Sequence, residues 1–198
     1  MLDLDISNMI DYTLAVSDQD LNGILALQAK NLKQCLSKQE AEAQGFLTVA
    51  HSYESLKKLN DAERHVIAKV GDEVIGYVLS MTKNARLDIP LLYPMFQIFD
   101  ATVYNNKTIS ESDYIIVGQV CVDKNFRGQR VFDNCYSTYK ELHKSKYHFA
   151  ITEIAETNVR SLQAHKRIGF SELTSYNDPN NTTWVVVIWD WKDSSISH

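Results

Sequence analysis

The chain has 198 residues, of which 44% are hydrophobic and 10% aromatic, and its formal net charge at pH 7 is −5. This length supports one substantial hydrophobic core but not two typical enzyme domains, so we expect a single domain over residues 1–198. The negative charge, in a sequence with no Lys/Arg run, argues against a nucleic-acid partner and mildly favours a cationic ligand such as an amine.

The sequence gives no signal for export or for a metal site. The acidic residues 1–5 are not followed by an apolar leader, and no window approaches eighteen consecutive apolar residues. Three cysteines, Cys35, Cys121 and Cys135, show neither a disulfide framework nor paired metal spacing. We therefore expect a cytoplasmic protein with no membrane partner and no bound metal.

The first part of the chain predicts a strand, two helices and a hairpin. Residues 12–16 are a short strand candidate, and Ser17 or Asp18 can cap a following helix. The apolar positions of that helix recur at nearly helical spacing: Leu21, Ile24, Leu25 and Leu32. A second helix is expected near residues 52–59. Residues 65–70 and 74–81 are rich in β-branched side chains and flank a Gly-Asp-Glu turn, which predicts a β-hairpin.

Residues 82–113 form a connection that is too long for a simple loop. Its centre, residues 89–99, is apolar enough to bury itself, which predicts a short helix packed near the sheet. Three interpretations of this connection stay open: a segment that covers the core, the wall of an acceptor pocket, or a dimer contact. The pocket interpretation uses four aromatic residues: Tyr93, Phe96, Phe99 and Tyr104.

The most informative stretch runs from residue 114 to residue 170. An extended run over residues 114–122 leads into a short basic turn, residues 123–130, and then into a helical pattern over residues 131–144. A strand that breaks into such a turn and opens a helix can hold phosphate, because free backbone N–H groups and the positive end of the helix dipole converge there. A second extended run, residues 149–155, precedes Asn158, a short helix and the pair Gly169-Phe170.

The chain ends with a second predicted hairpin. Residues 170–176 and 183–191 are extended runs separated by a turn-rich segment, residues 177–181. The β-branched and aromatic content of the last run favours a strand.

The order and spacing of these elements resemble the acyl-CoA-binding core of the GCN5-related N-acetyltransferase (GNAT) superfamily. In that family a strand ends in a Val shortly before an Arg or Gln, which opens a phosphate-binding turn written Gln/Arg-x-x-Gly-x-Gly/Ala. Val122 and Arg127 match this pattern. The family pattern continues with a later strand, an Asn, and a helix that ends at a Gly-Phe pair, and Asn158 and Gly169-Phe170 match these positions. The chain departs from the family where the two glycine positions of the turn hold Arg130 and Phe132, so the small residues that let a backbone approach a ligand are missing.

The resemblance implies an α/β fold with a mixed, strongly twisted sheet of about seven strands, flanked by helices on both faces. The fourth and fifth strands are expected to part and admit CoA. The implied activity is direct transfer of an acetyl group from acetyl-CoA to an amine, either a small amine or a protein N-terminus. Two alternatives stay open: a non-catalytic protein that binds acyl-CoA or a metabolite, and a structural domain without a CoA site. The acceptor, the acyl length and the existence of a homodimer stay open as well.

The resemblance also assigns a cofactor site. Backbone groups of Val120, Cys121 and Val122 would bind the pantetheine arm and polarise the thioester carbonyl. The phosphate turn would use the main chain of Arg127, Gly128, Gln129, Arg130, Val131 and Phe132. Asn158 would hydrogen-bond to pantetheine, a role compatible with capping the helix that follows.

Two residues are candidates for proton transfer. Glu153 lies where some N-terminal-amine acetyltransferases of this family carry a catalytic Glu, and partial burial would raise its pKa toward neutrality, as a general base requires. The alternatives are a supporting role in deprotonation, for example through a water, and a solvated or paired Glu; Glu156 is a weaker substitute for the base. His165 lies one turn before Gly169, where the family usually has a Tyr that protonates the departing sulfur. It would act as His⁺, or it would pack near the cofactor without proton transfer.

Overall fold

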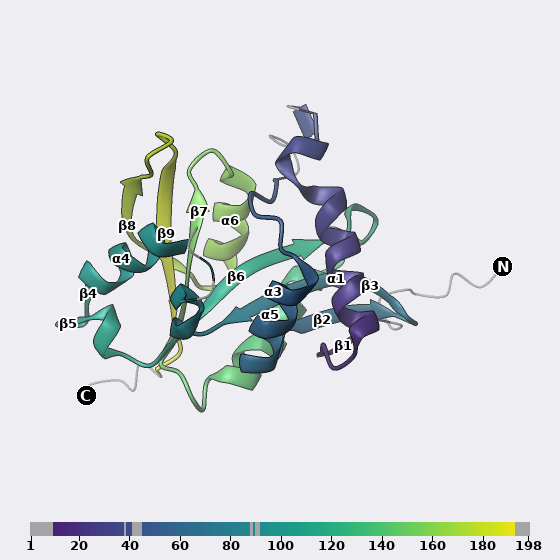
Figure 1. Ribbon diagram of the computed structural model, residues 1–198, viewed down its shortest axis with the longest axis horizontal. Coiled ribbons are helices and arrows are strands. Elements are labelled where there is room, and N and C mark those ends of the chain that lie inside the picture. The colour runs from purple at the N-terminus through teal and green to yellow at the C-terminus, as the bar shows by residue number, and fades with distance from the viewer. Residues whose placement is uncertain (1–9, 38, 41–44, 88, 90–91, 193–198) are drawn as a thin grey trace.

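The computed structural model describes residues 10–37, 39–40, 45–87, 89 and 92–192. Within these residues a seven-stranded sheet runs in the order β1-β2-β3-β6-β7-β9-β8 (Figure 1). Its strands are β1 (Ile10–Leu14), β2 (Val66–Val70), β3 (Glu73–Met81), β6 (Tyr114–Val122), β7 (Phe149–Ala155), β8 (Ser171–Asn177) and β9 (Thr183–Asp190). β6 and β7 run parallel, and the other neighbouring strands of this sheet are antiparallel. The mixed seven-stranded sheet expected from the sequence is confirmed.

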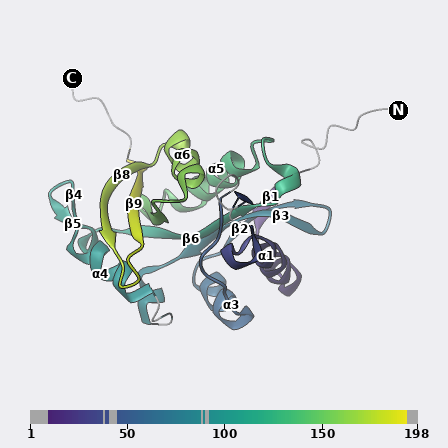
Figure 2. The ribbon, with the colours of Figure 1, turned by 90° about the horizontal axis from the view of Figure 1, so that it is seen from above.

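Helices cover both faces of the sheet, as Figure 2 shows from above. The helices α1 (Asp18–Asn31) and α3 (Tyr53–Ala62) lie on one face, and α5 (Val131–His143) and α6 (Val159–Ile168) lie on the other. Side chains alternate along a strand, so β3 contributes to both layers: Tyr77 and Leu79 pack with α1 and α3, while Val78 packs with α5. The core is therefore divided by the sheet.

Capping residues set the helix boundaries as the sequence predicts. Ser17 Oγ accepts a hydrogen bond from Asp20 N at 3.2 Å and Asp20 Oδ2 accepts one from Ser17 N at 3.0 Å, a capping box that starts α1. Asn158 caps α6, and Gly169 ends it in the left-handed conformation with a φ of +113°.

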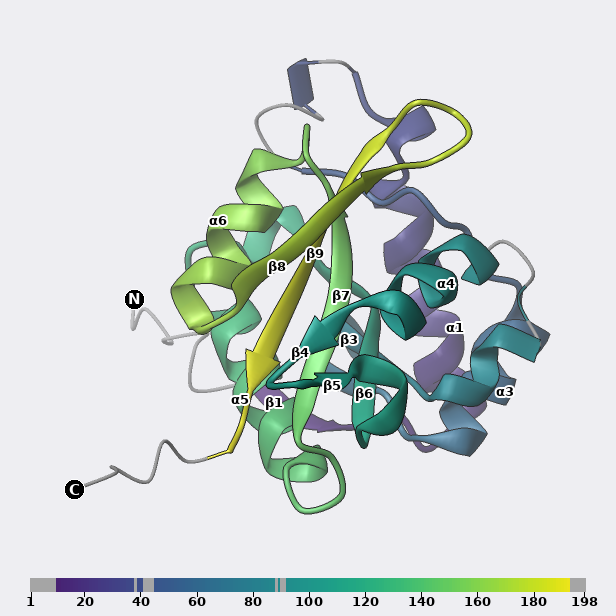
Figure 3. The same cartoon turned by 90° about the vertical axis from the view of Figure 1, so that its left-hand side faces the viewer.

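The connection over residues 82–113 contains α4 (Tyr93–Ala101), which starts later than the helix expected over residues 89–99 (Figure 3). Residues 88, 90 and 91 lie outside the described residues. Phe96 and Phe99 are buried against β6, β7 and β9, whereas Tyr93 is 56% exposed. This packing agrees with a segment that covers the core.

Four short elements in the described part of this connection were not predicted from the sequence: two 3₁₀ turns, Lys83–Leu87 and Ile109–Glu111, and a hairpin of β4 (Val103–Tyr104) and β5 (Lys107–Thr108). The signal for the hairpin is the Asn105-Asn106 pair, in which both residues have positive φ.

β6 and β7 pair only at their starts. Their register has three partners: Tyr114 with Phe149, Ile115 with Ala150, and Ile116 with Ile151. Just beyond, Thr152 Oγ1 donates a hydrogen bond to Val117 O at 2.8 Å, which bridges the two strands as they separate. The expected parting of the fourth and fifth strands is confirmed, and it places the ends of both strands on either side of a gap.

Candidate active site

The gap between β6 and β7 contains two small cavities that continue into a third, larger one. The first has a volume of about 90 Å³ and lies between residues 117–120 of β6 and residues 152–155 of β7. The second, of about 110 Å³, shares Val120, Asn158 and Ser161 with it. The third has a volume of about 740 Å³ and shares Val122 and Arg127 with the second. Together they follow β6 from its middle to the start of α5.

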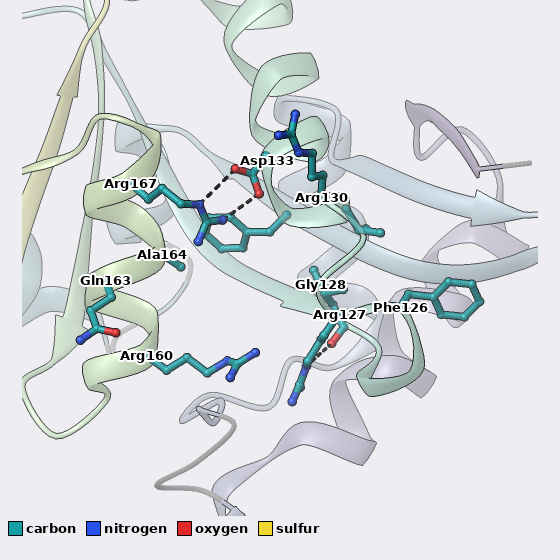
Figure 4. Close-up of a pocket in the computed structure, with 12 residues that line it drawn as sticks. Phe126, Arg127, Gly128, Arg130, Asp133, Arg160, Gln163, Ala164 and Arg167 are labelled. Atoms are coloured by element: carbon teal, nitrogen blue, oxygen red, sulfur yellow. Dashed lines mark hydrogen bonds and ion pairs between the residues drawn. The ribbon is translucent and has the colours of Figure 1, made fainter. Parts of the chain in front are cut away.

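The large cavity lies at the basic turn before α5 (Figure 4). Gly128 has a φ of +81°, and no atom beyond its two chain neighbours lies within 4 Å of the place where a Cβ would stand, so its backbone is open to a ligand. Arg130 is the N-cap of α5 and has a φ of +60°. Its side chain makes no capping hydrogen bond, so the first N–H groups of α5 have no side-chain cap. The turn therefore has the geometry of an anion site.

Arg130 and Phe132, which stand at the two glycine positions of the family turn, are both accommodated in this structure. Arg130 adopts the left-handed conformation that a glycine would adopt without strain. Phe132 lines the cavity and packs its ring against the rings of Tyr136 and His165, with centroids 4.9 and 5.3 Å away. The side chain of Arg127 braces the turn, because Nε donates to Val122 O at 3.1 Å and Nη2 donates to Asn31 Oδ1 at 3.0 Å.

Residues 45–49, which we name the crossing segment, extend over the gap between the parted strands. Asn158 Nδ2 donates to Phe46 O at 3.1 Å, and Gln119 Nε2 donates to Val49 O at 2.8 Å. The segment is thus held from α6 on one side and from β6 on the other. Asn158 Oδ1 also accepts a long bond, 3.4 Å, from Ser161 N at the start of α6. Asn158 therefore has the expected capping role, and its contact with pantetheine stays a prediction.

Glu153 lines the first of these cavities together with Gly118 and Gln119 of β6. Burial raises its pKa from 4.5 to about 7. A hydrogen bond from the Tyr176 hydroxyl to Glu153 Oε2, 2.5 Å long, opposes this rise, and the charge of Asp178 adds to it. Glu153 is therefore a partly protonated carboxyl group at neutral pH, in contact with the groove.

His165 lines the same cavity but is buried and fully hydrogen-bonded. Its Nδ1 lies 2.8 Å from Ser161 O, which can only accept, so Nδ1 carries the proton and Nε2 accepts from the Tyr136 hydroxyl at 2.6 Å. Burial lowers the pKa of His165 to about 4, although the Ser161 carbonyl opposes this. An imidazolium is disfavoured here near neutral pH, which favours the alternative of a packing residue.

Of the strand residues assigned to the cofactor, Val120 and Cys121 line the second cavity, and Val122 lines the second and the third. Burial raises the pKa of the Cys121 thiol to about 12, so the thiol stays protonated beside the groove. Val131 lines the large cavity and is buried in the core. Gln129 lines none of the three cavities; its amide donates to Asn125 O at 3.2 Å.

A polar network under the crossing segment was not foreseen from the sequence. Gln119 Oε1 accepts from Gln28 Nε2 at 2.8 Å and from the Tyr77 hydroxyl at 2.6 Å. Gln28 Oε1 accepts from His51 N at 2.8 Å, just past the crossing segment. The one feature of the sequence that could have indicated this network is a glutamine, Gln119, within the otherwise apolar run of β6. No such signal marked Tyr176, Arg160 or Arg167.

Two further observations concern the described residues as a whole. None of their helices is long and apolar enough to cross a membrane. No three of their His, Cys, Asp and Glu side chains gather as a metal ion would require.

A sheet that parts between two parallel strands, with an anion-binding turn at the mouth of the gap, is the architecture of an acyltransferase that uses a CoA thioester. Comparison with protein families agrees: the model of the Acetyltransferase (GNAT) family matches residues 31–170. The chain belongs to this family and is an N-acetyltransferase by that membership. The family uses acetyl-CoA.

Solved structures share the fold at low sequence identity. The ribosomal-protein-S18-alanine N-acetyltransferase from Escherichia coli is 12% identical, with a TM-score of 0.59 over 92% of this chain and 94% of that one. Ard1 from Thermoplasma volcanium is 11% identical, with a TM-score of 0.62 over 92% and 97%. yncA from Salmonella typhimurium, solved with its cofactor acetyl-CoA, is 11% identical, with a TM-score of 0.59 over 96% and 99%. No curated protein matches the chain in sequence.

Proposed function

We propose that the protein transfers an acetyl group from acetyl-CoA directly to a primary amine in the groove between β6 and β7. The observation that carries this proposal is the position of Glu153, a half-buried carboxyl group whose pKa is raised to about 7, in the first cavity, between the two strands. A general base works best when its pKa lies near the operating pH. The turn before α5, at the other end of the same row of cavities, suits the phosphates of the donor.

Each part of the groove has a chemical task in this proposal. The first N–H groups of α5 and the open backbone at Gly128 bind the diphosphate. The main chain of Val120 and Cys121 binds the arm and polarises the thioester carbonyl. Glu153 takes a proton from the acceptor, whose nitrogen lone pair then forms a bond to the carbonyl carbon. The carbon–sulfur bond breaks, and the thiolate leaves with the electron pair and takes up a proton.

His165 has a positioning role in this proposal. Two hydrogen bonds and a lowered pKa keep it neutral, and its ring packs against Phe132 and Phe170 at centroid distances of 5.3 and 5.1 Å. It therefore supports Phe132 beside the large cavity. The proton for the thiolate then comes from another source, for which water in the groove is sufficient.

An α-amino group, as at a protein N-terminus, is the acceptor that we favour over a lysine side chain or a polyamine. The pKa of an α-amine is about 7.7–8.0, whereas that of a lysine amine is about 10.4. A base with a pKa of about 7 is well matched to the first and poorly matched to the second. The name of the Escherichia coli structure describes an enzyme that acts on an alanine of a ribosomal protein, which is consistent with this choice.

The test has a binding step and a turnover step. Calorimetric titration with acetyl-CoA should show one site, and a panel of peptides, small amines and polyamines should release free thiol with peptides as the best acceptors. Glu153→Gln should bind acetyl-CoA normally but release thiol about a hundredfold more slowly or worse, as loss of a general base predicts. Glu156→Gln is the matched control, because Glu156 is exposed and lies just after β7.

Wild-type turnover in Glu153→Gln would remove Glu153 from the mechanism. Faster acetylation of a polyamine than of any peptide would overturn the choice of acceptor without affecting the donor site.

A further inference from the structure

We propose that Arg160 and Arg167 of α6 bind the 3′-phosphate of CoA, so that the protein prefers complete CoA to dephospho-CoA. This inference rests on the proposed function, because it concerns the donor that the groove accepts. It assigns a role to one face of α6, a helix that the sequence singled out only for its cap and its last turn.

The large cavity has two walls (Figure 4). One wall is the turn before α5, including Arg127, Gly128 and Arg130. The other wall is α6, from which Arg160 and Arg167 project toward the cavity. The lining residues of α6 are Arg160, Gln163, Ala164 and Arg167, which follow the i, i+3, i+4, i+7 spacing of a single helix face. One face of this helix, which carries both arginines, is therefore turned to the cavity.

The charge of the cavity is opposite to that of the protein. Four arginines line it, against one carboxylate, Asp133, in a chain with a formal net charge of −5. The turn wall already offers backbone amides for a diphosphate. The arginines of the helix wall add positive charge for a further anionic group on the same ligand.

Arg167 is held in place before any ligand arrives. Its Nη2 donates to Asp133 Oδ2 at 2.7 Å and its Nε donates to Asp133 Oδ1 at 3.3 Å, while its guanidinium lies over the Phe132 ring at 5.9 Å. A guanidinium fixed in this way loses less entropy when it binds a phosphate. Arg160 lies two helical turns earlier on the same face of α6, and it also lines the second cavity, between the turn and the groove.

A phosphate monoester is the chemistry that best fits this wall. It carries a charge of about −1.5 to −2 at pH 7 and presents three acceptor oxygens, which suit the planar donor sets of two arginines. In CoA, a monoester is attached to the same ribose that carries the diphosphate. With the diphosphate at the turn, the monoester faces the opposite wall of the one cavity.

The experiment is a thermodynamic cycle with two ligands and matched variants. Calorimetry is carried out with CoA and dephospho-CoA on the wild type, Arg160→Gln and Arg167→Gln. We expect the wild type to bind CoA at least about tenfold more tightly than dephospho-CoA, as one charge-assisted hydrogen bond predicts. Each variant should lose most of this preference while its affinity for dephospho-CoA stays within about twofold.

Lys166→Gln is the control, because Lys166 is an exposed residue of the same helix that does not line the cavity. It removes the same charge and should retain the preference, which separates a local contact from a general effect of net charge. Arg167→Lys tests geometry, since it keeps the charge but loses the planar donor pair, and it should show an intermediate preference.

Equal affinity of the wild type for the two ligands would overturn the inference and leave the proposed function intact. Variants that weaken both ligands to the same extent would also overturn it, because the arginines would then act on the part the ligands share. If the wild type binds neither ligand nor acetyl-CoA, the proposed function itself fails.

Discussion

Replacing Glu153 by Gln should make the protein more stable at the same time as it impairs catalysis. Burial raises the pKa of Glu153 from 4.5 to about 7, so the folded state holds this carboxyl group in its charged form at a free-energy cost above pH 7. Gln is neutral, has nearly the same shape, and keeps an oxygen that can accept the bond from the Tyr176 hydroxyl. The substitution therefore removes the cost of the charge and retains the hydrogen bond.

The size and the pH dependence of the gain follow from the two pKa values. A rise from 4.5 to about 7 corresponds to about 3 kcal/mol when the group is fully charged. Because the folded pKa is raised, the penalty is absent below pH 4.5, grows as the pH rises from 4.5 to 7, and is constant above that. Relative to the wild type, Glu153→Gln should gain about 3 kcal/mol at pH 8 and less than about 1 kcal/mol at pH 5.

Urea denaturation of both proteins at pH 5 and pH 8 measures this difference, and thiol release at varied pH completes the test. In the wild type, kcat/KM should rise with pH up to about 7 as Glu153 loses its proton. Glu156→Gln should change neither curve. A variant that is equally stable at both pH values would refute the reasoning, because the charge of Glu153 would then cost nothing to bury.

Three further predictions concern stability and reactivity. Acidification from pH 8 to pH 5 should remove about 2 kcal/mol of stability through each of His143 and His165, since burial lowers both pKa values to about 4 and the unfolded chain binds the extra protons, while relief of the Glu153 penalty offsets part of this loss; His143→Gln should reduce the loss in urea denaturation. Gly169→Ala should cost more stability than Gly71→Ala, because both have positive φ but only the Cβ at 169 would lie 2.8 Å from Trp189 Nε1; equal losses of melting temperature would contradict this. Cys35 alone should react with a thiol reagent in the folded protein, since Cys121 and Cys135 are buried with pKa values raised to about 12; rapid reaction of a second thiol would show that the groove opens readily.

The sheet, the turn and the helix after it were predictable because their determinants are local. The apolar run of β6, the basic turn and the cap at Asn158 each lie within a few residues of the structure they specify. Glu153 was predictable as a groove residue for a similar reason, since its strand and its distance from Asn158 are fixed by sequence spacing.

The rest depends on contacts between distant parts of the chain. Phe46 O is bound by Asn158, 112 residues away, and Val49 O by Gln119, 70 residues away, so no local pattern announces the crossing segment. His165 was expected near the cofactor, but its neutral state is set by Tyr136 from another helix and by burial. The hairpin of β4 and β5 has two residues in each strand, too few for a periodic pattern.

The short junction between β6 and β7 has a consequence for how the molecule responds to its donor. Beyond their three register pairs, the strands lack the ladder that elsewhere ties one strand to the next, so within the sheet β7, β9 and β8 pair with the other half over a short stretch only, and the packing of α4 and α5 joins the halves beyond it. A donor lying along the groove, as proposed, would contact both halves where this ladder is missing. Donor binding would then stabilise the joined halves by a free energy that grows with the logarithm of donor concentration above the Kd. Amides near Val117 and Thr152 should accordingly exchange their hydrogens more slowly as the donor concentration rises, so the rigidity of this junction would depend on occupancy of the groove.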